Sequence, residues 1–330
     1  MARNAPGVVT AMAKTYNHLF GPVPSRRFGR SLGVDLTPFK TCSLDCTFCQ
    51  LGQTTQKTTA RDEYVPTQTV LAELKDWLEA DGQADVVTLA GSGEPTLHSN
   101  FGEIITFLRE NCSIPVLLLT NGTFLHLPEV RKAASAAHMV KASLCAWNED
   151  SFCCVNRPCA GVTLENLVRG EAAFSQEFAG TFYLEVFLLW GISSTPHDVK
   201  RIAALAAEIA PDHTQLNTAV RPPAEDFAVA LPQKRMQDLV ALFSPEAEVI
   251  AEFSAGEAPD IQANETTIIA MLKRRPCTAK QIAAVFNMHL NEVSKYIGKL
   301  TRTGRINGVQ EGNGTYYSAS DGALTEGTPE

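Results

Sequence analysis

The chain has 330 residues and a formal net charge of −8, from 28 Lys and Arg against 36 Asp and Glu. This length exceeds the roughly 200–250 residues of one α/β barrel and predicts a small second module. The acidic balance argues against a protein that coats nucleic acid or an anionic membrane over its whole surface, although a local basic patch stays open. The longest apolar run, residues 182–192, contains Glu185 and is too short to cross a bilayer, so no membrane association is expected.

Nine cysteines are present, and two of them, Cys153 and Cys154, are adjacent. A disulfide framework would not readily use adjacent cysteines or an odd total. With no signal peptide recognised at the N-terminus, these features predict a reducing, cytoplasmic location.

The N-terminal part of the chain leads into a cysteine-rich loop. Residues 1–17 carry no clear period and are expected to be flexible, and residues 18–30 are rich in Gly, Pro and Arg, which predicts an ordered loop. Residues 31–36 are a short strand candidate that delivers the chain to the cysteines.

Cys42, Cys46 and Cys49 stand in a C-x3-C-x2-C spacing, which puts three thiolates within reach of one iron–sulfur cluster. A [4Fe–4S] cube is normally held by four thiolates, so three cysteines leave one iron open to an outside ligand. Zinc is the alternative, because thiolates also bind zinc. No Cys or His lies between Gln50 and Ala90 to complete a zinc site nearby.

Apolar strand candidates alternate with amphipathic helices after this loop. The expected strands are residues 85–90, 116–120, 139–145, 181–189 and 214–217, and the expected helices are residues 67–79, 101–110, 197–209 and 233–243. This alternation predicts right-handed βαβ units and a parallel sheet. A complete barrel has eight units and six are counted here, so the α/β fold expected for residues 18–252 is a partial (β/α)6 TIM-like barrel.

Polar residues follow several of these strands, where α/β proteins bind ligands. The run Gly91-Ser92-Gly93-Glu94-Pro95 follows the second strand, and its glycines allow close approach of the backbone to a ligand. Asn121 closes the third strand within a Thr-Asn-Gly run that is equally typical of a simple turn. Ser143 lies near the end of the fourth strand. Glu185 interrupts the fifth, where it must face the barrel lumen or pair with a cation.

Arginines flank both ends of the expected barrel. They are Arg26, Arg27 and Arg30 before the cysteines, and Arg221 after the sixth strand, near Asn217. Guanidinium groups suit carboxylates and phosphates, so substrate binding and the tying of loops to the barrel are equal alternatives.

The cysteine spacing, with Phe48 just before the third cysteine, resembles the cluster loop of the radical S-adenosylmethionine (radical SAM) enzymes. The run from Gly91 to Pro95 resembles the GGEP motif of that family, with Ser92 in place of the second glycine. Over residues 18–225 the chain is similar to an uncharacterised branch of radical SAM proteins related to the tRNA 4-demethylwyosine synthases.

The resemblance implies a [4Fe–4S] cluster on Cys42, Cys46 and Cys49, whose open iron takes the amino and carboxylate groups of S-adenosylmethionine. One electron, from a donor such as flavodoxin or ferredoxin, then yields methionine and a 5′-deoxyadenosyl radical that abstracts hydrogen from a substrate. A nucleotide in RNA is a candidate substrate. The residues expected to contact S-adenosylmethionine are Gly91, Ser92, Gly93, Glu94, Pro95, Asn121, Ser143 and Glu185.

One departure argues against wybutosine chemistry. The demethylwyosine synthases carry additional cysteines ahead of the radical SAM loop, and no cysteine here precedes Cys42. Four later cysteines could hold an auxiliary cluster, supply a catalytic thiol, or serve only as small apolar side chains. They are Cys145, Cys153, Cys154 and Cys159.

The C-terminal block changes character after an expected linker at residues 253–263. Within residues 264–319, helices are expected at 265–273, 278–286 and 290–301, followed by a hairpin over 305–318 that turns at Asn313-Gly314. This order resembles a winged helix-turn-helix, and residues 320–330 are expected to be a disordered tail.

The C-terminal block is basic although the whole chain is acidic. Lys295, Lys299 and Arg302 share one face of the last expected helix, and residues 260–320 hold eight Lys and Arg against four Asp and Glu. Nucleic acid is therefore a candidate partner, and docking to a protein or to the barrel is the alternative. A transcription regulator that senses a cluster or S-adenosylmethionine is the competing function to an enzyme.

Overall fold

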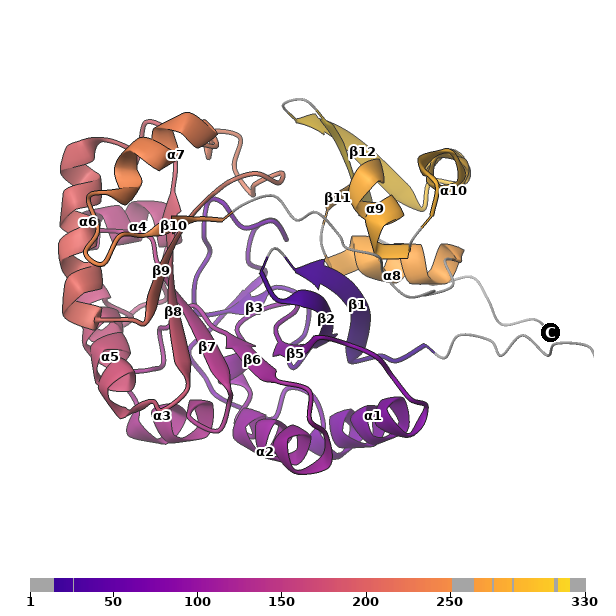
Figure 1. The fold of residues 1–330 in the computed structure, drawn as a ribbon, viewed down its shortest axis with the longest axis horizontal. Coiled ribbons are helices and arrows are strands. Elements are labelled where there is room, and N and C mark those ends of the chain that lie inside the picture. Colours follow the sequence, from indigo (N-terminus) through magenta and orange to yellow (C-terminus); the bar gives the residue numbers. More distant parts are fainter. Residues whose placement is uncertain are drawn as a thin grey trace, which may run out of the picture.

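The computed structural model describes residues 15–25, 27–250, 264–274, 276–286, 288–311 and 314–320. Its largest element is an eight-stranded sheet in the order β1-β2-β5-β6-β7-β8-β9-β10. The sheet curves, and helices cover its outer face (Figure 1). The fold is therefore α/β, as the alternation of strands and helices predicts.

The strands are β1 (Leu19–Ser25), β2 (Gly29–Val34), β5 (Val86–Leu89), β6 (Val116–Leu119), β7 (Met139–Leu144), β8 (Thr181–Leu188), β9 (His213–Thr218) and β10 (Glu248–Val249). Every pairing from β2 to β10 is parallel, and only β1 pairs antiparallel, with β2. The expected parallel strands are confirmed as β2 and β5 to β9, so their carboxyl ends share one edge of the sheet.

The helices around this sheet are α1 (Thr67–Glu79), η1 (Pro95–Leu97), α2 (Phe101–Asn111), α3 (Pro128–Ala134), α4 (Glu149–Asn156), α5 (Leu164–Glu177), α6 (Pro196–Ile209) and α7 (Gln233–Val240). The sequence predicted α1, α2, α6 and α7 and missed α3, α4 and α5. Short α3 and α4 give little periodicity, and α5 carries polar residues around Gly170 that break up its apolar stripe.

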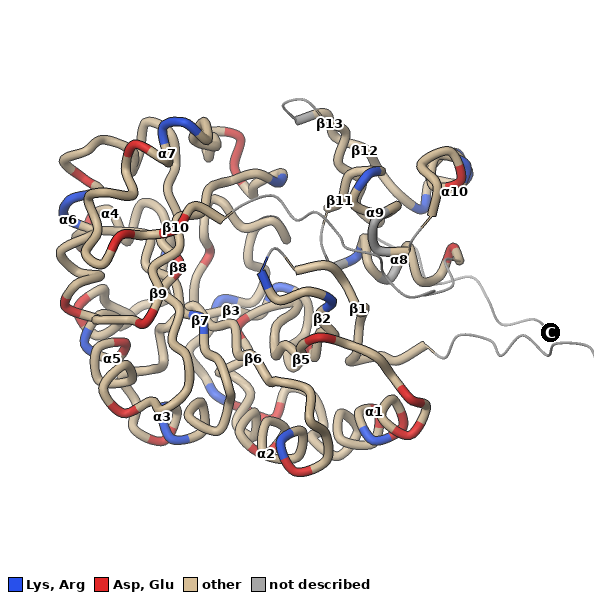
Figure 2. Tube along the Cα trace, in the orientation of Figure 1, with Lys and Arg blue, Asp and Glu red and all other residues tan. Residues whose placement is uncertain are grey.

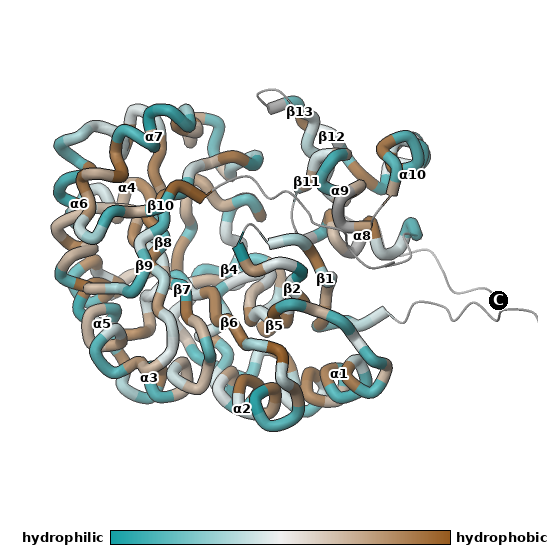
Figure 3. The backbone as a smooth tube through the Cα atoms, viewed as in Figure 1, coloured by the Kyte–Doolittle hydropathy of each residue, from teal (hydrophilic) through white to brown (hydrophobic). Residues whose placement is uncertain are grey.

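The core lies between the sheet and the outer helices. All four residues of β5 are buried, and Val70, Leu74 and Trp77 place the apolar face of α1 in the same cluster. Apolar segments run along the strands while hydrophilic residues mark the outer loops and helix faces (Figure 3). Burial of both faces explains why these strands are continuous apolar runs.

The prediction of a loop at residues 18–30 is wrong, because strand β1 occupies most of this range. This strand lies at the edge of the sheet, where Pro22 and Pro24 need no second ladder partner. Its pairing with β2 shifts register between Phe20 and Val23, which accommodates the Gly-Pro step.

The C-terminal elements are α8 (Glu265–Arg274), β11 (Cys277–Thr278), α9 (Ala279–Phe286), α10 (Leu290–Arg302), β12 (Ile306–Glu311) and β13 (Gly314–Ala319). The three strands form an antiparallel sheet in the order β11-β13-β12. Their apolar cluster includes Val23 of β1, so this unit packs against the edge of the large sheet. Several of the expected segments lie wholly or partly outside the described residues. These parts are residues 1–14, the linker 253–263, Asn313 of the expected turn and tail residues 321–330.

Charged residues of both signs are scattered over the outer helices (Figure 2). In the C-terminal unit, Lys299 of the expected basic face forms an ion pair with Glu265 of α8, which also pairs with Arg305. Part of the charge on that basic face is therefore compensated by an ion pair within the C-terminal unit. Among the described helices, none combines the length and apolarity that a membrane span requires.

Two glycines in helices give opposite expectations for stability. A Cβ at Gly170 would lie 2.3 Å from the backbone nitrogen of His126, whereas a Cβ at Gly298 of α10 meets nothing within 4 Å. Gly170→Ala should destabilise the fold by about 1–3 kcal/mol through overpacking. Gly298→Ala should stabilise its helix by about 0.5–1 kcal/mol through the lower entropy of the unfolded chain. Thermal and urea unfolding of both variants tests this, and equal shifts would contradict the tight packing of α5.

Candidate active site

The three cysteines of the C-x3-C-x2-C loop lie at the carboxyl edge of the sheet, beside two cavities. Cys42 and Cys46 line a cavity of about 290 Å³, and Cys49 lines a second cavity of about 420 Å³. Short strands β3 (Thr41–Cys42) and β4 (Gln56–Lys57) pair in parallel and close the base of the loop. The three thiols therefore lie next to two cavities that share part of their lining.

A different side chain donates a hydrogen bond to each of the three sulfurs. Asn121 Nδ2 lies 3.5 Å from the Cys42 sulfur, and Asn156 Nδ2 lies 3.3 Å from the Cys46 sulfur. Lys40 Nζ lies 3.2 Å from the Cys49 sulfur. N–H donors of this kind favour the anionic form of sulfur, so the three thiols sit in surroundings suited to thiolate ligands.

Burial opposes that tendency in the free thiols. Desolvation raises the pKa of Cys42 to about 12, with a further contribution from the Glu94 carboxylate. Desolvation also raises the pKa of Cys46 well above its usual value, assisted by the neighbouring thiols. Burial therefore favours the neutral thiols of Cys42 and Cys46, and a metal ion bound at the sulfurs would favour the thiolates.

The loop after β5 is joined to the start of the cysteine loop through the backbone. Lys40 N donates to the Ser92 carbonyl at 2.6 Å, and Glu94 N donates to the Thr41 carbonyl at 3.1 Å. A Cβ at Gly93 would lie 1.8 Å from the Thr41 oxygen. Glycine is therefore required at position 93 by this contact between the two loops.

Ser92, which departs from the GGEP pattern, has a defined partner. Its backbone nitrogen and its hydroxyl both donate to the carboxylate of Asp35, at 2.9 and 2.5 Å. Asp35 directly follows β2 and is buried. The serine therefore fixes the loop after β5 to the neighbouring strand end.

Glu94 joins the second and third strand ends through its side chain. Its carboxylate accepts hydrogen bonds from Thr96, from the Thr120 hydroxyl at 2.7 Å and from the Asn121 backbone nitrogen at 2.7 Å. Burial raises the pKa of this carboxyl, although each hydrogen bond acts in the opposite direction. The buried carboxylate thus organises the loop that carries Asn121. Pro95 begins helix η1 next to it.

Ser143 and Glu185 occupy neighbouring register positions on β7 and β8, and both line the smaller cavity. Glu185 forms an ion pair with Lys141 of β7. Both alternatives that the sequence left open for Glu185 therefore hold, because it faces the lumen and also pairs with a cation.

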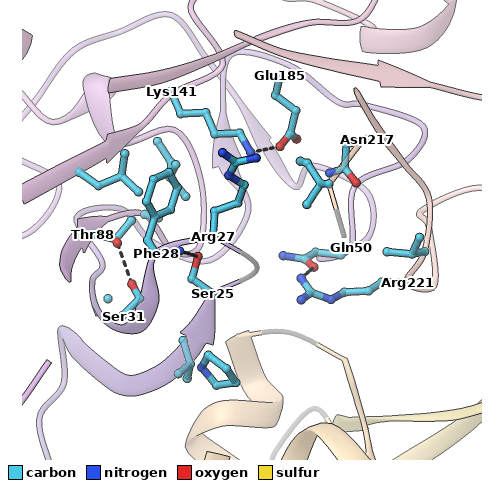
Figure 4. A pocket seen from close by; sticks show the side chains of 18 of the residues that line it. Ser25, Arg27, Phe28, Ser31, Gln50, Thr88, Lys141, Glu185, Asn217 and Arg221 are labelled. Carbon is cyan, nitrogen blue, oxygen red and sulfur yellow. Dashed lines mark hydrogen bonds and ion pairs between the residues drawn. The ribbon is translucent and has the colours of Figure 1, made fainter. Parts of the chain in front are cut away.

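The two cavities share part of their lining. The shared residues are Phe48, Ala90, Gly91, Leu119, Lys141 and Glu185. Figure 4 shows the Lys141–Glu185 pair and the bonded side chains of Gln50 and Arg221, which, like Arg27 and Asn217, line the larger cavity. Phe48 stacks on Phe187 of β8 with ring centroids 3.9 Å apart. The aromatic residue of the cysteine loop therefore anchors that loop to the barrel wall.

The arginines singled out in the sequence have different surroundings. Arg30 contacts Asp85, and Arg27 pairs with Glu248. Arg221 donates to Gln50 at 2.6 Å. Arg26 lies outside the described residues.

The four later cysteines have different exposures. Cys145 is buried, and Cys153 and Cys154 are exposed on α4. Within the part of the chain that the structure describes, no three His, Cys, Asp or Glu side chains are placed to hold a single metal ion. The same holds for Cys42, Cys46 and Cys49, so this geometry does not distinguish zinc from a cluster on the C-x3-C-x2-C loop.

Sequence reasoning missed Lys40, Asn156 and Asp35. Lys40 stands two residues before Cys42 and could have been noticed from that proximity. Asn156 lies 110 residues after Cys46, and nothing in the sequence connects the two. Asp35 was hidden because its role depends on the parallel neighbour of β2.

Comparison with known proteins places this arrangement in a family. Residues 36–210, more than half of the chain, match the Radical SAM superfamily. A UPF0026 protein of Synechocystis is 37% identical over 212 residues, which cover 64% of this chain and 78% of that protein. A protein of Brachyspira hyodysenteriae named GTPase Obg is 35% identical over 294 residues. That match covers 87% of this chain and 43% of the Brachyspira protein, so the chain spans less than half of that relative.

The fold agrees with this assignment. A structure of TYW1 with a lysine-pyruvate adduct bound has a TM-score of 0.50 and 15% identity, covering 69% of this chain and 76% of that one. Fold and sequence together define an iron–sulfur enzyme that works with S-adenosylmethionine. The chain belongs to the radical SAM superfamily. Its cofactors are those of the superfamily, a [4Fe–4S] cluster and S-adenosylmethionine.

A buried carboxyl group lies behind the Asn121 loop and gives a pH-dependent expectation. Neither oxygen of Glu171 has a hydrogen-bond partner among the described residues, and burial raises its pKa well above the usual value. The unfolded chain releases this proton near the ordinary Glu pKa, while the folded chain keeps it to higher pH. Wild-type stability should therefore fall as pH rises between these two pKa values.

Glu171→Gln removes this ionisation, so its stabilising effect should be larger at pH 8 than at pH 5. Urea unfolding at both values measures the difference. Glu165→Gln, at an exposed position on the same helix, is the control and should show little change with pH. An effect of Glu171→Gln that is the same at both pH values would contradict a protonated Glu171 in the fold.

Proposed function

We propose that this protein cleaves S-adenosylmethionine reductively and directs the resulting 5′-deoxyadenosyl radical to a hydrogen atom of a substrate bound in the barrel. The observation that carries the proposal is the set of three cysteines beside two connected cavities, each sulfur accepting one side-chain N–H. Such donors serve a cluster that must change its charge during the reaction.

Cys42, Cys46 and Cys49 are the proposed cluster ligands. The donor set fits, because it consists of thiols only and three of them leave one iron of a [4Fe–4S] cube free. The cluster, when bound, supplies the electron and the open iron. The chain's own residues would hold the sulfurs in place, and Asn156 donates a hydrogen bond to the Cys46 sulfur.

The residues proposed to bind S-adenosylmethionine line the smaller cavity or support its wall. Gly91, Gly93 and Glu94 contribute the loop after β5, and Asn121, Ser143 and Glu185 face the cavity from the next strands. Ser92 and Pro95 hold that loop through Asp35 and helix η1. Backbone carbonyls of the loop suit the ammonium group, and the polar side chains suit the ribose and carboxylate.

An external reductant such as flavodoxin or ferredoxin is the proposed electron source, and the cytoplasm is the proposed location. A nucleotide in RNA remains a proposed substrate. The sensing regulator gains no support from the similar proteins, so the enzyme is the function put forward.

The C-terminal unit is proposed to be a winged helix-turn-helix spanning residues 264–319. Its support is the element order α8-β11-α9-α10-β12-β13 with an antiparallel three-stranded sheet. Lys295 and Arg302 would offer charge to a nucleic acid, while Lys299 is already paired with Glu265. We also propose the limits of the other segments. The barrel spans residues 18–252, the linker spans 253–263, and the flanking segments are 1–17 and 320–330.

Anaerobic reconstitution with iron and sulfide, followed by dithionite reduction and chromatography for 5′-deoxyadenosine, tests the proposal. Wild type should bind a cluster and form 5′-deoxyadenosine. Cys46→Ala should lose more than about 100-fold of that activity, because a cluster ligand is removed. Cys154→Ala, which changes an exposed cysteine on α4, is the matched control and should behave as wild type. A cluster without cleavage would favour a sensor, and the absence of a cluster would overturn the proposal.

The hydrogen bonds to the sulfurs predict the reduction potential. Lys40 is buried and places its ammonium group on the Cys49 sulfur, which should stabilise the reduced and more negative cluster. Lys40→Met should therefore lower the midpoint potential in a redox titration followed by electron paramagnetic resonance. Lys57→Met is the matched control, because Lys57 is opposite Cys42 in the β3–β4 pair and donates to the carbonyls of Arg157 and Pro158 instead of to sulfur. Equal shifts of the midpoint potential in both variants would show that the effect comes from the charge alone and not from the hydrogen bond to Cys49.

A further inference from the structure

Asn156 is the last residue of α4 and lines the smaller cavity together with Cys42 and Cys46. Only 3% of its surface is exposed. Its Nδ2 atom donates to the Cys46 sulfur at 3.3 Å, whereas its buried Oδ1 atom has no hydrogen-bond partner among the described residues. A buried amide oxygen without a partner costs free energy, so a donor group of a ligand would be stabilised at this atom.

The sulfurs determine which end of the Asn156 amide faces them. A thiolate that binds a metal accepts hydrogen bonds but cannot donate them, so the nitrogen end of the amide must face Cys46. Burial raises the pKa of the neighbouring Cys145 thiol to about 12, and a hydrogen bond with the Asn156 side chain acts in the opposite direction. Both thiols therefore lie at the nitrogen end of the amide, and Oδ1 is the end left for a ligand.

The position of Asn156 is fixed by main-chain atoms. The backbone nitrogen of Asp45 donates to the Asn156 carbonyl at 3.0 Å, and that of Thr47 donates to the Val155 carbonyl at 2.9 Å. The last turn of α4 is therefore docked on the cysteine loop through bonds that a substitution of the Asn156 side chain would keep. Because the residue is held beside Cys46 before any ligand binds, a contact to it costs little ordering entropy.

The position of Asn156 in the barrel narrows the choice of donor on S-adenosylmethionine. The ammonium group is proposed to bind the loop after β5, and β6 separates β5 from β7, the strand that precedes α4. The donors that remain are the ribose hydroxyls and the adenine amino group. Asn156 contacts a proposed cluster ligand, and the methionine part of the molecule is expected at the open iron. The ribose is the next group along the molecule, so a ribose hydroxyl is the donor nearest to this end of the cavity.

We propose that Asn156 binds S-adenosylmethionine and a cluster ligand at the same time: its Oδ1 atom accepts a hydrogen bond from a ribose hydroxyl while its Nδ2 atom donates to the Cys46 sulfur. This inference rests on the proposed function, because it assigns a further binding residue to the same active site. One planar amide would then orient the ribose relative to the cluster. Hydrogen bonds in such a chain strengthen one another, so binding of S-adenosylmethionine and the charge of the cluster would be coupled through this side chain.

The test is equilibrium dialysis of the reconstituted full-length protein with S-adenosylmethionine and with its 2′-deoxy and 3′-deoxy forms. Wild type should bind one of the deoxy forms about 3- to 10-fold more weakly, the effect of losing a neutral hydrogen bond. Asn156→Ala should bind S-adenosylmethionine more weakly by a similar factor and should lose most of the discrimination against that deoxy form. Asn111→Ala, at the exposed last residue of α2, is the matched control and should discriminate as wild type does.

The midpoint potential of the cluster gives a second readout. Without S-adenosylmethionine, Asn156→Ala should have a lower midpoint potential than wild type in a redox titration, because a donor to the Cys46 sulfur is lost. Asn111→Ala should leave the potential unchanged. If Asn156→Ala does not retain a cluster, Asn156→Ser carries both measurements, since its hydroxyl is one bond shorter than the amide and cannot span both partners.

Wild type that binds all three forms equally, or Asn156 variants that discriminate against the deoxy form as strongly as wild type, would overturn the inference. A variant that changes the potential but not the discrimination would also overturn it, because Asn156 would then serve the sulfur alone. Formation of 5′-deoxyadenosine is measured in parallel with wild type. Discrimination without cleavage would count against the proposed function alone, whereas cleavage without discrimination would count against this inference alone.

Discussion

The backbone contact between residues 40–41 and residues 92–94 is the constraint on which the rest of the site depends. Two hydrogen bonds cross it, and Gly93 lies where any Cβ would collide with the Thr41 carbonyl. The contact sets how far the cysteine loop stands from the end of β5. Glu94 also accepts hydrogen bonds from Thr120 and Asn121. A shift of this loop would therefore also displace the residues that follow β6.

The surroundings of the sulfurs are built from distant parts of the chain. Lys40 reaches Cys49 from a left-handed backbone conformation, with φ of 60°, which an L-residue adopts only when its surroundings compensate. The hydrogen bonds of the same residue to Ser92 and Cys49 supply that compensation. Asn156 reaches Cys46 from the end of α4, so the cysteine loop also needs the fourth βα connection to be in place.

The sequence predicted those features whose cause is local. The cysteine spacing and the Gly-Ser-Gly-Glu-Pro run each lie within ten residues, and the buried parallel strands are apolar runs of the expected length. Features that depend on a partner elsewhere in the fold could not be predicted. Strand β1 was missed because its prolines are tolerated only at a sheet edge, and the pairing of Lys299 with Glu265 needs the position of α8.

The ion pair between Lys141 and Glu185 explains how one barrel lumen can hold two compartments. Both residues point inward from adjacent parallel strands, and a lone charge from either would be costly in this partly buried space. Paired, they form a polar wall that contributes no net charge to either cavity. A single barrel lumen therefore offers one compartment beside Cys42 and Cys46 and a second one beside Cys49, with this pair in the lining of both.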